Sequence, residues 1–320
     1  MSMECVFASI FQSANFCFSF QMDEMDMILM QPSHDKDTDI SSPRIKGSFS
    51  FSSVQPSPTE HQPERPSPHP LKFHLNTEED HGGYILSLSH NRIRHLRHIL
   101  ENSALHKLES EMVCNRILSK ASKSKNPKLT KESFDAAVAS ILSKASEEFV
   151  SDPALVEILR GIFASFDREK SGKVSAMEVA CGFTVMCNGK KSDKLEFAFE
   201  VLDKRKKGHL SKSDMTNYLR SFLTVLLSIA FSPSLDSDAR TDSLTTLKGQ
   251  SCDPSPATLT KAADAGAKWA ASMAFNSLRD LHSDPSMSFD EFAEWYTSSG
   301  YSSIPWLELL DLRKWVFADN

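Results

Sequence analysis

The sequence predicts an all-α protein in which paired helix–loop–helix units form two lobes, preceded by a disordered N-terminal tail. Three observations lead to this prediction. After Ser89, apolar residues recur at three- and four-residue steps, as on one face of a helix. Short polar segments rich in Asp, Ser, Gly and Lys interrupt that spacing. Residues 1–71, by contrast, show no periodic apolar pattern, which is typical of a segment that cannot bury enough surface to fold.

Composition excludes several classes of function. The 320 residues carry a formal net charge of −6, so we expect no nucleic-acid partner. The six cysteines form no CxxC pair, which predicts neither a zinc site nor a disulfide framework but reduced thiols and a cytoplasmic location. No Lys or Arg precedes Lys36, which disfavours a secretory signal. The longest apolar run, 221–231, is shorter than the roughly 20 residues of a membrane-spanning helix, so no transmembrane segment is expected.

We divide the chain into three parts. Residues 1–71 are the tail, whose Phe- and Met-rich start at 6–30 is either an amphipathic helix that docks on a partner or an unstructured terminus. Residues 72–190 are assigned to the N-terminal lobe. Residues 191–320 are assigned to the C-terminal lobe, with an inserted surface loop at 232–255 that is rich in Ser, Asp, Thr and Pro.

The first helical stretch is unusually basic at one end. Its cationic residues are Arg92, Arg94, His95, Arg97 and His98. We expect them to lie on a solvated helix face, the usual meaning of such a run, with a phosphate- or zinc-binding role as the alternative.

Residues 167–178 are the one stretch whose residue types and spacing specify a chemistry. Oxygen-bearing groups stand at the first, third, fifth, seventh, ninth and twelfth positions, and Gly172 at the sixth supplies a sharp turn. The predicted metal ligands are Asp167, Glu169, Ser171, the Lys173 carbonyl, Ser175 and Glu178. This is the pattern of an EF-hand calcium loop. At the eighth position Val174 can pair its backbone with a neighbouring loop.

Two further segments keep the shape of this loop without its ligands. Residues 122–133 offer no carboxylate at a ligand position and have Pro127 in place of the glycine, so we expect a silent loop. Residues 203–214 keep the glycine, but Arg205 and Lys207 stand at ligand positions and would repel a divalent ion.

A fourth candidate loop occupies residues 280–291 and has Pro285 where the glycine should be. Proline restricts φ to about −65°, so calcium binding there would need a rearranged loop. Trp295, Trp306 and Trp315 then mark an aromatic C-terminal helix, which we expect to fill the groove of the second lobe until a target displaces it.

The stretch from Phe166 to Asp203 resembles the central hands of the calcineurin B and neuronal calcium sensor group within the EF-hand superfamily. The resemblance covers roughly residues 88–320, with clear motifs only at 158–227. It implies an all-α regulator that binds calcium and presents a groove to an amphipathic target helix. Ser2 stands where this group carries a myristoylated glycine, so a membrane switch is not implied.

The sequence therefore predicts a calcium-responsive regulatory adaptor that acts by binding a protein target. It uses mainly one Ca²⁺ site, with Mg²⁺ as an alternative occupant of the loop. The alternative is a constitutive EF-hand scaffold that does not sense calcium. An enzyme is not expected, because the chain shows no phosphate-binding loop, nucleophile elbow or kinase motif.

Overall fold

The computed structural model describes residues 70–76, 83–103, 105–145, 153–203, 206–235, 242–276, 286–310, 312 and 316. These residues belong to one compact unit. The predictions made for residues 1–69, and for Asp280 to Pro285 of the fourth loop, lie outside the described residues.

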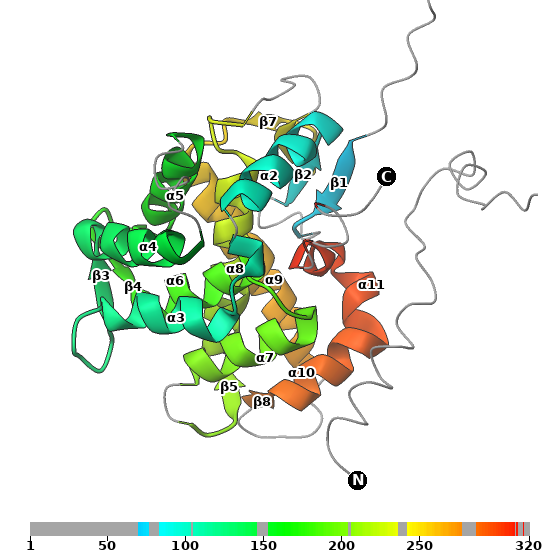
Figure 1. The fold of residues 1–320 in the computed structure, drawn as a ribbon. Helices are drawn as coiled ribbons and strands as arrows, with labels where there is room; N and C mark the ends of the chain where they lie inside the picture. Colours follow the sequence, from blue (N-terminus) through cyan, green and yellow to red (C-terminus); the bar gives the residue numbers. More distant parts are fainter. Residues whose placement is uncertain are drawn as a thin grey trace, which may run out of the picture. The chain divides into compact units, whose positions relative to one another are not determined.

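Helices make up most of the described structure (Figure 1). The α-helices are α2 (His90–Ser103), α3 (Ser110–Ser119), α4 (Lys131–Ala145), α5 (Pro153–Phe166), α6 (Ala176–Phe183), α7 (Lys191–Leu202), α8 (Lys212–Ala230), α9 (Pro256–Asn276), α10 (Phe289–Trp295) and α11 (Tyr301–Ser303). Shorter turns are the 3-10 helices η3 (Leu105–Lys107), η4 (Thr184–Met186) and η6 (Pro305–Leu310) and the π-helical turn η5 (Tyr296–Gly300). Within the described ranges, every helix is too short or too polar to cross a membrane.

The prediction of an all-α fold is wrong, because the helices are accompanied by three antiparallel sheets. Strands β1 (Leu71–His74), β2 (Tyr84–Leu88), β6 (Ser243–Thr246) and β7 (Ser251–Cys252) form a four-stranded sheet in the order β1-β2-β6-β7. Two smaller sheets pair β3 (Lys128–Thr130) with β4 (Lys173–Ser175) and β5 (His209–Ser211) with β8 (Ser286–Ser288).

The four-stranded sheet uses residues for which the sequence predicted no strand. Strand β1 begins at the last residue of the predicted tail, and β6 and β7 lie inside the predicted surface loop at 232–255. In β1 the side chain of Phe73 is buried while Lys72 and His74 are exposed, the two-residue alternation of a half-buried strand. Over four residues this pattern is too short to distinguish from loop, and the strand is stabilised by a partner elsewhere in the chain.

The two small sheets join the helix–loop–helix units in pairs. Leu129 lies opposite Val174, and Leu210 lies opposite Met287. All four side chains are buried. The first loop is thus bridged to the second, and the third to the fourth, with each bridge covered by an apolar pair.

Helix α8 connects the two pairs of helix–loop–helix units. Helix α8 packs against α5, α6 and α9. At the crossing of α6 and α8, a Cβ atom on Gly182 would lie 2.6 Å from the carbonyl oxygen of Ser221, so this approach requires glycine. Tyr218 of α8 is fully buried and donates a 2.9 Å hydrogen bond to the Leu195 carbonyl on α7.

Arg92 departs from the prediction of a solvated basic face on α2. Its side chain is buried, its Nε lies 3.2 Å from Asp242 Oδ2, and it also donates a hydrogen bond to the Ala230 carbonyl. Arg94 and His98 are exposed, as expected. One member of the basic run therefore joins α2 to the end of α8 and to the residue before β6.

The C-terminal segment is a broken series of turns, not the single aromatic helix that the sequence predicted. Helix α10 runs into the π-helical turn, α11 and η6. Trp306 is completely buried. Lys191 at the start of α7 donates a 2.6 Å hydrogen bond to Tyr296 Oη and lies 3.1 Å from Glu308 Oε1. The segment is therefore part of the core and is anchored to α7.

Candidate metal centre

The loop from Asp167 to Glu178 is wound around the carboxylate of its first residue. Asp167 Oδ1 accepts a 2.9 Å hydrogen bond from the Ser171 N–H, and Oδ2 accepts a 2.8 Å bond from the Gly172 N–H. Lys170 and Gly172 have φ values of 52° and 71°, in the left-handed region that lets the chain turn back on itself. The backbone therefore curls tightly about Asp167 between α5 and β4.

The other predicted ligands of this loop divide into two groups. The Ser171 hydroxyl donates to Lys173 O at 3.1 Å and lies 3.2 Å from Asp167 Oδ1, so these three oxygen-bearing groups are brought together. Ser175 instead caps α6, where its hydroxyl accepts from the Glu178 N–H at 3.4 Å. The Glu169 side chain is exposed.

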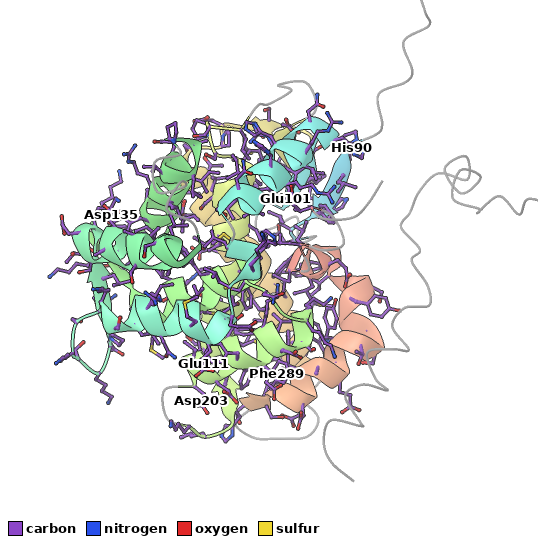
Figure 2. The ribbon with its side chains drawn as sticks, viewed as in Figure 1. His90, Glu101, Glu111, Asp135, Asp203 and Phe289 are labelled. Carbon is purple, nitrogen blue, oxygen red and sulfur yellow. The ribbon has the colours of Figure 1, made fainter. Side chains whose placement is uncertain are left out.

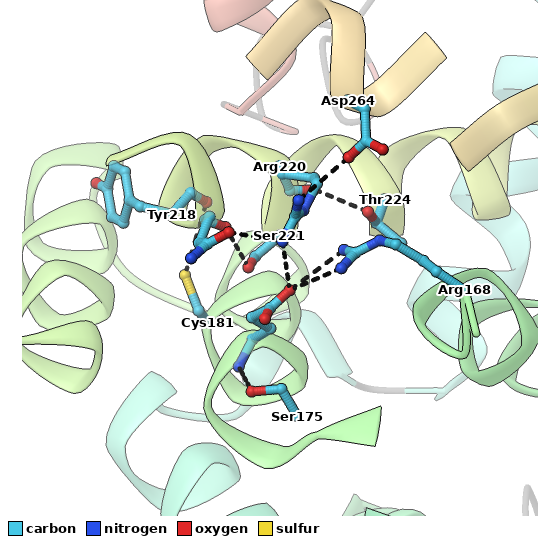
Figure 3. Close-up of polar contacts among 10 residues, drawn as sticks. Arg168, Ser175, Cys181, Tyr218, Arg220, Ser221, Thr224 and Asp264 are labelled. Atoms are coloured by element: carbon cyan, nitrogen blue, oxygen red, sulfur yellow. Dashed lines mark hydrogen bonds and ion pairs between the residues drawn. The ribbon is translucent and has the colours of Figure 1, made fainter. Parts of the chain in front are cut away.

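Glu178, the predicted bidentate ligand, is bound to two arginines. Its Oε2 lies 3.2 Å from both terminal nitrogens of Arg168 and 3.3 Å from Nη2 of Arg220. Figure 3 shows Arg168 and Arg220 converging on this carboxylate from the loop and from α8. All three side chains are largely buried, with exposed fractions of 16% for Glu178, 23% for Arg168 and 16% for Arg220. Partial burial strengthens such charge-assisted contacts relative to surface pairs.

The arginine pair extends the site into the neighbouring helices. Arg220 also lies 3.3 Å from Asp264 Oδ1 on α9 and donates a 2.6 Å hydrogen bond to Asn217 Oδ1 on its own helix. Sequence reasoning missed Arg220 and Asp264 as members of the site. One signal was available for Arg220, which is the one charged residue between Asp214 and Asp236.

The arrangement fits a calcium ion in part. Calcium takes six to eight oxygen ligands, and the Asp167 carboxylate, Ser171 hydroxyl and Lys173 carbonyl are of that kind. Among the described residues, no three His, Cys, Asp or Glu side chains lie close enough together to hold a metal, so Asp167, Glu169 and Glu178 form no such group. The loop would gain its twelfth-position carboxylate only if Glu178 left the arginines.

The third loop repeats the backbone of the second. Asp203 Oδ2 accepts a 2.7 Å hydrogen bond from the Gly208 N–H, and Lys206 and Gly208 have φ values of 49° and 76°. Figure 2 shows Asp203 at the end of α7 beside the β5–β8 pair, with Phe289 at the start of α10. Arg205 lies outside the described residues, whereas Lys207 is exposed at its predicted ligand position. The described part of the loop keeps this turn, although Arg205 and Lys207 stand at two of the positions that hold ligands in a calcium loop.

The first loop is closed by hydroxyl groups. Ser122 Oγ accepts a 2.9 Å hydrogen bond from the Lys128 N–H, and Ser124 Oγ donates a 2.8 Å bond to the Asn126 carbonyl. The Pro127 carbonyl accepts from the N–H of Ala176 in the second loop at 3.0 Å. The hydroxyl oxygens of Ser122 and Ser124, which stand at ligand positions, therefore take part in hydrogen bonds within the loop.

In the fourth loop only the C-terminal part is described. Glu291 Oε2 accepts from the N–H of Ser288 at 2.7 Å, while Ser288 Oγ accepts from the Glu291 N–H at 3.2 Å. This reciprocal arrangement is a capping box, which satisfies backbone donors at the start of α10. Glu291 is thus used locally, whereas Glu178 reaches across to another helix.

No family model matches the chain, and several curated proteins are similar to it over short segments. A calcium and calcium/calmodulin-dependent serine/threonine-protein kinase of Pisum sativum is 32% identical over 69 residues, 22% of this chain and 13% of the kinase. Ubiquitin carboxyl-terminal hydrolase 32 of Homo sapiens is 29% identical over 76 residues, 24% of this chain and 5% of the hydrolase. Lysophosphatidylcholine acyltransferase 2B of Rattus norvegicus is 33% identical over 66 residues, 20% of this chain and 13% of the acyltransferase. The matched segments are thus a small fraction of each of these relatives.

Proposed function

We propose that this protein is a calcium-binding EF-hand regulator or adaptor that responds to calcium mainly through residues 167–178 and acts by binding a partner protein. The observation that carries the proposal is the loop wound around Asp167, closed by the Gly172 N–H and bridged through Val174 to Leu129. A cation would be held by the six predicted ligand positions, with Ca²⁺ as the main occupant and Mg²⁺ as a competitor.

An aromatic cluster supports a response to the ion. The centroid of the Phe134 ring lies 5.3 Å from that of the Phe163 ring and 6.0 Å from that of the Phe183 ring. Helices α4, α5 and α6 therefore meet through three aromatic rings. In calcium sensors, ion binding reorients the exit helix and exposes apolar side chains. Movement of α6 would separate these rings and open an apolar surface for an amphipathic helix of the target.

The short relatives support a binding module more than a catalyst. Their names denote a kinase, a ubiquitin hydrolase and an acyltransferase, three different chemistries, and one name includes calcium. Segments of 66 to 76 residues that are similar to parts of such different enzymes fit a regulatory role that is separate from any of these reactions. We place the protein in the cytoplasm, on the expectation that its cysteines are reduced.

Isothermal titration of the full chain with calcium tests the proposal. We expect heat from essentially one site, lost in Glu178→Gln, which keeps the size of the side chain and removes its charge. Glu157→Gln is the matched control, because Glu157 forms an exposed ion pair with Arg160 on α5 and should leave the titration unchanged. Absence of calcium heat, or an unchanged titration in Glu178→Gln, would contradict the proposal.

A second function, a constitutive EF-hand scaffold, is favoured by the two ion pairs of Glu178. If Arg168 and Arg220 hold this carboxylate under all conditions, the loop keeps its shape without a metal. The scaffold predicts the same thermal midpoint and the same near-ultraviolet circular dichroism in excess calcium and in EDTA. The sensor predicts that calcium raises the midpoint, because a ligand that binds only the folded state stabilises it.

A further inference from the structure

We propose that Arg220 competes with calcium for the Glu178 carboxylate, so that ion binding at 167–178 releases the contact that joins α6 to α8 and, through Asp264, to α9. The inference rests on the proposed function and adds the regulation of the same site. The contact between Arg220 and Glu178 breaks when calcium fills the loop, and Arg220 thereby sets the calcium affinity.

The competition follows from the use of one oxygen by two kinds of cation. A bidentate twelfth-position glutamate gives both carboxylate oxygens to calcium at 2.3–2.6 Å. Here Oε2 of Glu178 already lies 3.2–3.3 Å from the nitrogens of Arg168 and Arg220. A divalent ion on the same oxygen would face two guanidinium groups at close range in a partly buried site, where like charges repel more strongly than in water. Calcium binding to Glu178 therefore weakens the contacts of this carboxylate with the two arginines.

Arg220 and Arg168 differ in the residues that position their side chains. Arg168 belongs to the loop and can move with Glu178 when the loop rearranges. Arg220 is fixed on α8, where Asn217 and Asp264 bind its terminal nitrogens. Release of Glu178 leaves Arg220 with these two partners, so its charge remains compensated while the link from the loop to α8 is lost.

The contact between Glu178 and Arg220 lies near a close approach of α6 and α8. Gly182 is one helical turn after Glu178 on α6, and its Cα faces the carbonyl of Ser221, the residue after Arg220 on α8. A shift of the start of α6 therefore acts directly on the α6–α8 contact. In the described part of the fourth loop, the twelfth-position Glu291 is bound to Ser288 within its own capping box and not to an arginine of another helix.

Calcium titration of Arg220→Gln tests the inference. Removal of one charge-assisted contact to Glu178 should tighten calcium binding about tenfold. Arg220→Lys, which keeps the charge without the forked donor geometry, should give an intermediate affinity. Arg160→Gln is the matched control for charge alone, since it removes a cation from an exposed position on α5 outside the loop and should change the affinity less than twofold.

A second variant predicts the opposite change and leaves α8 intact. Asp264→Asn removes the other carboxylate partner of Arg220, so Glu178 should hold the guanidinium more strongly and calcium binding should weaken severalfold. In an Arg220→Gln background the same Asp264→Asn change should have less than a twofold effect. An effect of equal size in both backgrounds would show that Asp264 acts by charge alone and would overturn the inference.

The outcomes separate the inference from the proposed function. If the wild-type chain binds calcium and Arg220→Gln binds no more tightly, the inference is wrong and the calcium site stands. If the wild-type chain does not bind calcium and Arg220→Gln does, the inference is supported and the natural chain is the constitutive EF-hand scaffold. If neither binds calcium while circular dichroism shows both folded, the inference and the proposed function are both overturned.

Discussion

Arg92 and Asp242 form an ion pair in the protein interior, with Arg92 Nε 3.2 Å from Asp242 Oδ2 and exposed side-chain fractions of 7% and 2%. Ser89 adds its backbone N–H at 2.6 Å and its hydroxyl at 3.0 Å to the same carboxylate. Asp242 therefore fixes the start of α2 beside the start of β6, and it joins the four-stranded sheet to the helical part of the chain.

Loss of the Asp242 charge should be strongly destabilising. In Asp242→Asn the amide oxygen can still accept from Ser89, but the Arg92 guanidinium is left buried without its counter-charge. Breaking a buried pair in this way costs about 3 kcal/mol. Urea denaturation should show this decrease in the free energy of unfolding. Arg97→Gln, which removes an exposed pair with Glu101 on the same helix, should cost less than about 0.5 kcal/mol. Equal decreases in the free energy of unfolding would show that the buried Arg92–Asp242 pair stabilises the fold no more than an exposed pair does.

Two helical glycines should respond to alanine with opposite signs. Gly161 on α5 has open space where a Cβ would stand, so Gly161→Ala should raise the free energy of unfolding by about 1 kcal/mol through helix propensity. A Cβ at Gly182 would lie 2.6 Å from Ser221 O and 2.7 Å from a Val225 methyl group. Gly182→Ala should therefore lower the free energy of unfolding by about 1–3 kcal/mol. Stabilisation by both changes in thermal melts would contradict the close crossing of α6 and α8.

Stability should fall as the pH rises above about 9, because of buried thiols. Desolvation by burial raises the pKa of Cys187 from 9.0 to about 12. Burial also raises the pKa of Cys114 and of Cys181. Between pH 9 and 12 the unfolded chain loses the Cys187 proton while the folded chain keeps it, so the free energy of unfolding decreases by about 1.4 kcal/mol per pH unit for this thiol. Urea titrations of Cys187→Ala across this range should show a slope that is shallower by that amount, and an unchanged slope would refute the assignment.

The cysteines should also differ in reactivity. Cys114, Cys181 and Cys187 are buried, whereas Cys252 on strand β7 is half-exposed. Since the thiolate is the nucleophile, burial and raised pKa both protect the first three. Iodoacetamide at pH 8, followed by peptide mass spectrometry, should label Cys252 in minutes and the buried three only after urea is added. Rapid labelling of Cys181 in the native protein would contradict its burial between α6 and α8.

The sequence indicates a helix most clearly where a helix-start residue or a loop motif directly precedes it. Helix α5 spans Pro153–Phe166, and its start is marked in the sequence because proline is well suited to a first helical position. Helix α8 begins at Lys212, where Ser211 provides an N-cap. The pairing of Val174 with a neighbouring loop is confirmed. These features depend on residues within a few positions of one another.

What the sequence did not predict depends on residues far apart in the chain. Strand β2 pairs with β6, and Tyr84 lies opposite Thr246, a partner that no local pattern identifies. The contact of Glu178 with Arg220 likewise depends on how α6 crosses α8. Hydrophobic spacing indicates which face of each helix is buried, but not which charged residues at the edges of two such faces will meet.

The order of strands in the sheet has a consequence for synthesis. Strands β1 and β2 are made early and can form a hairpin at once, but the second edge of β2 waits for Ser243–Thr246. At 5–20 residues per second a ribosome needs on the order of 10 s to make the intervening chain. For that time an apolar strand edge is open to other chains, as unpaired edges are templates for aggregation. The second edge of β2 is therefore covered only after Ser243–Thr246 have been made.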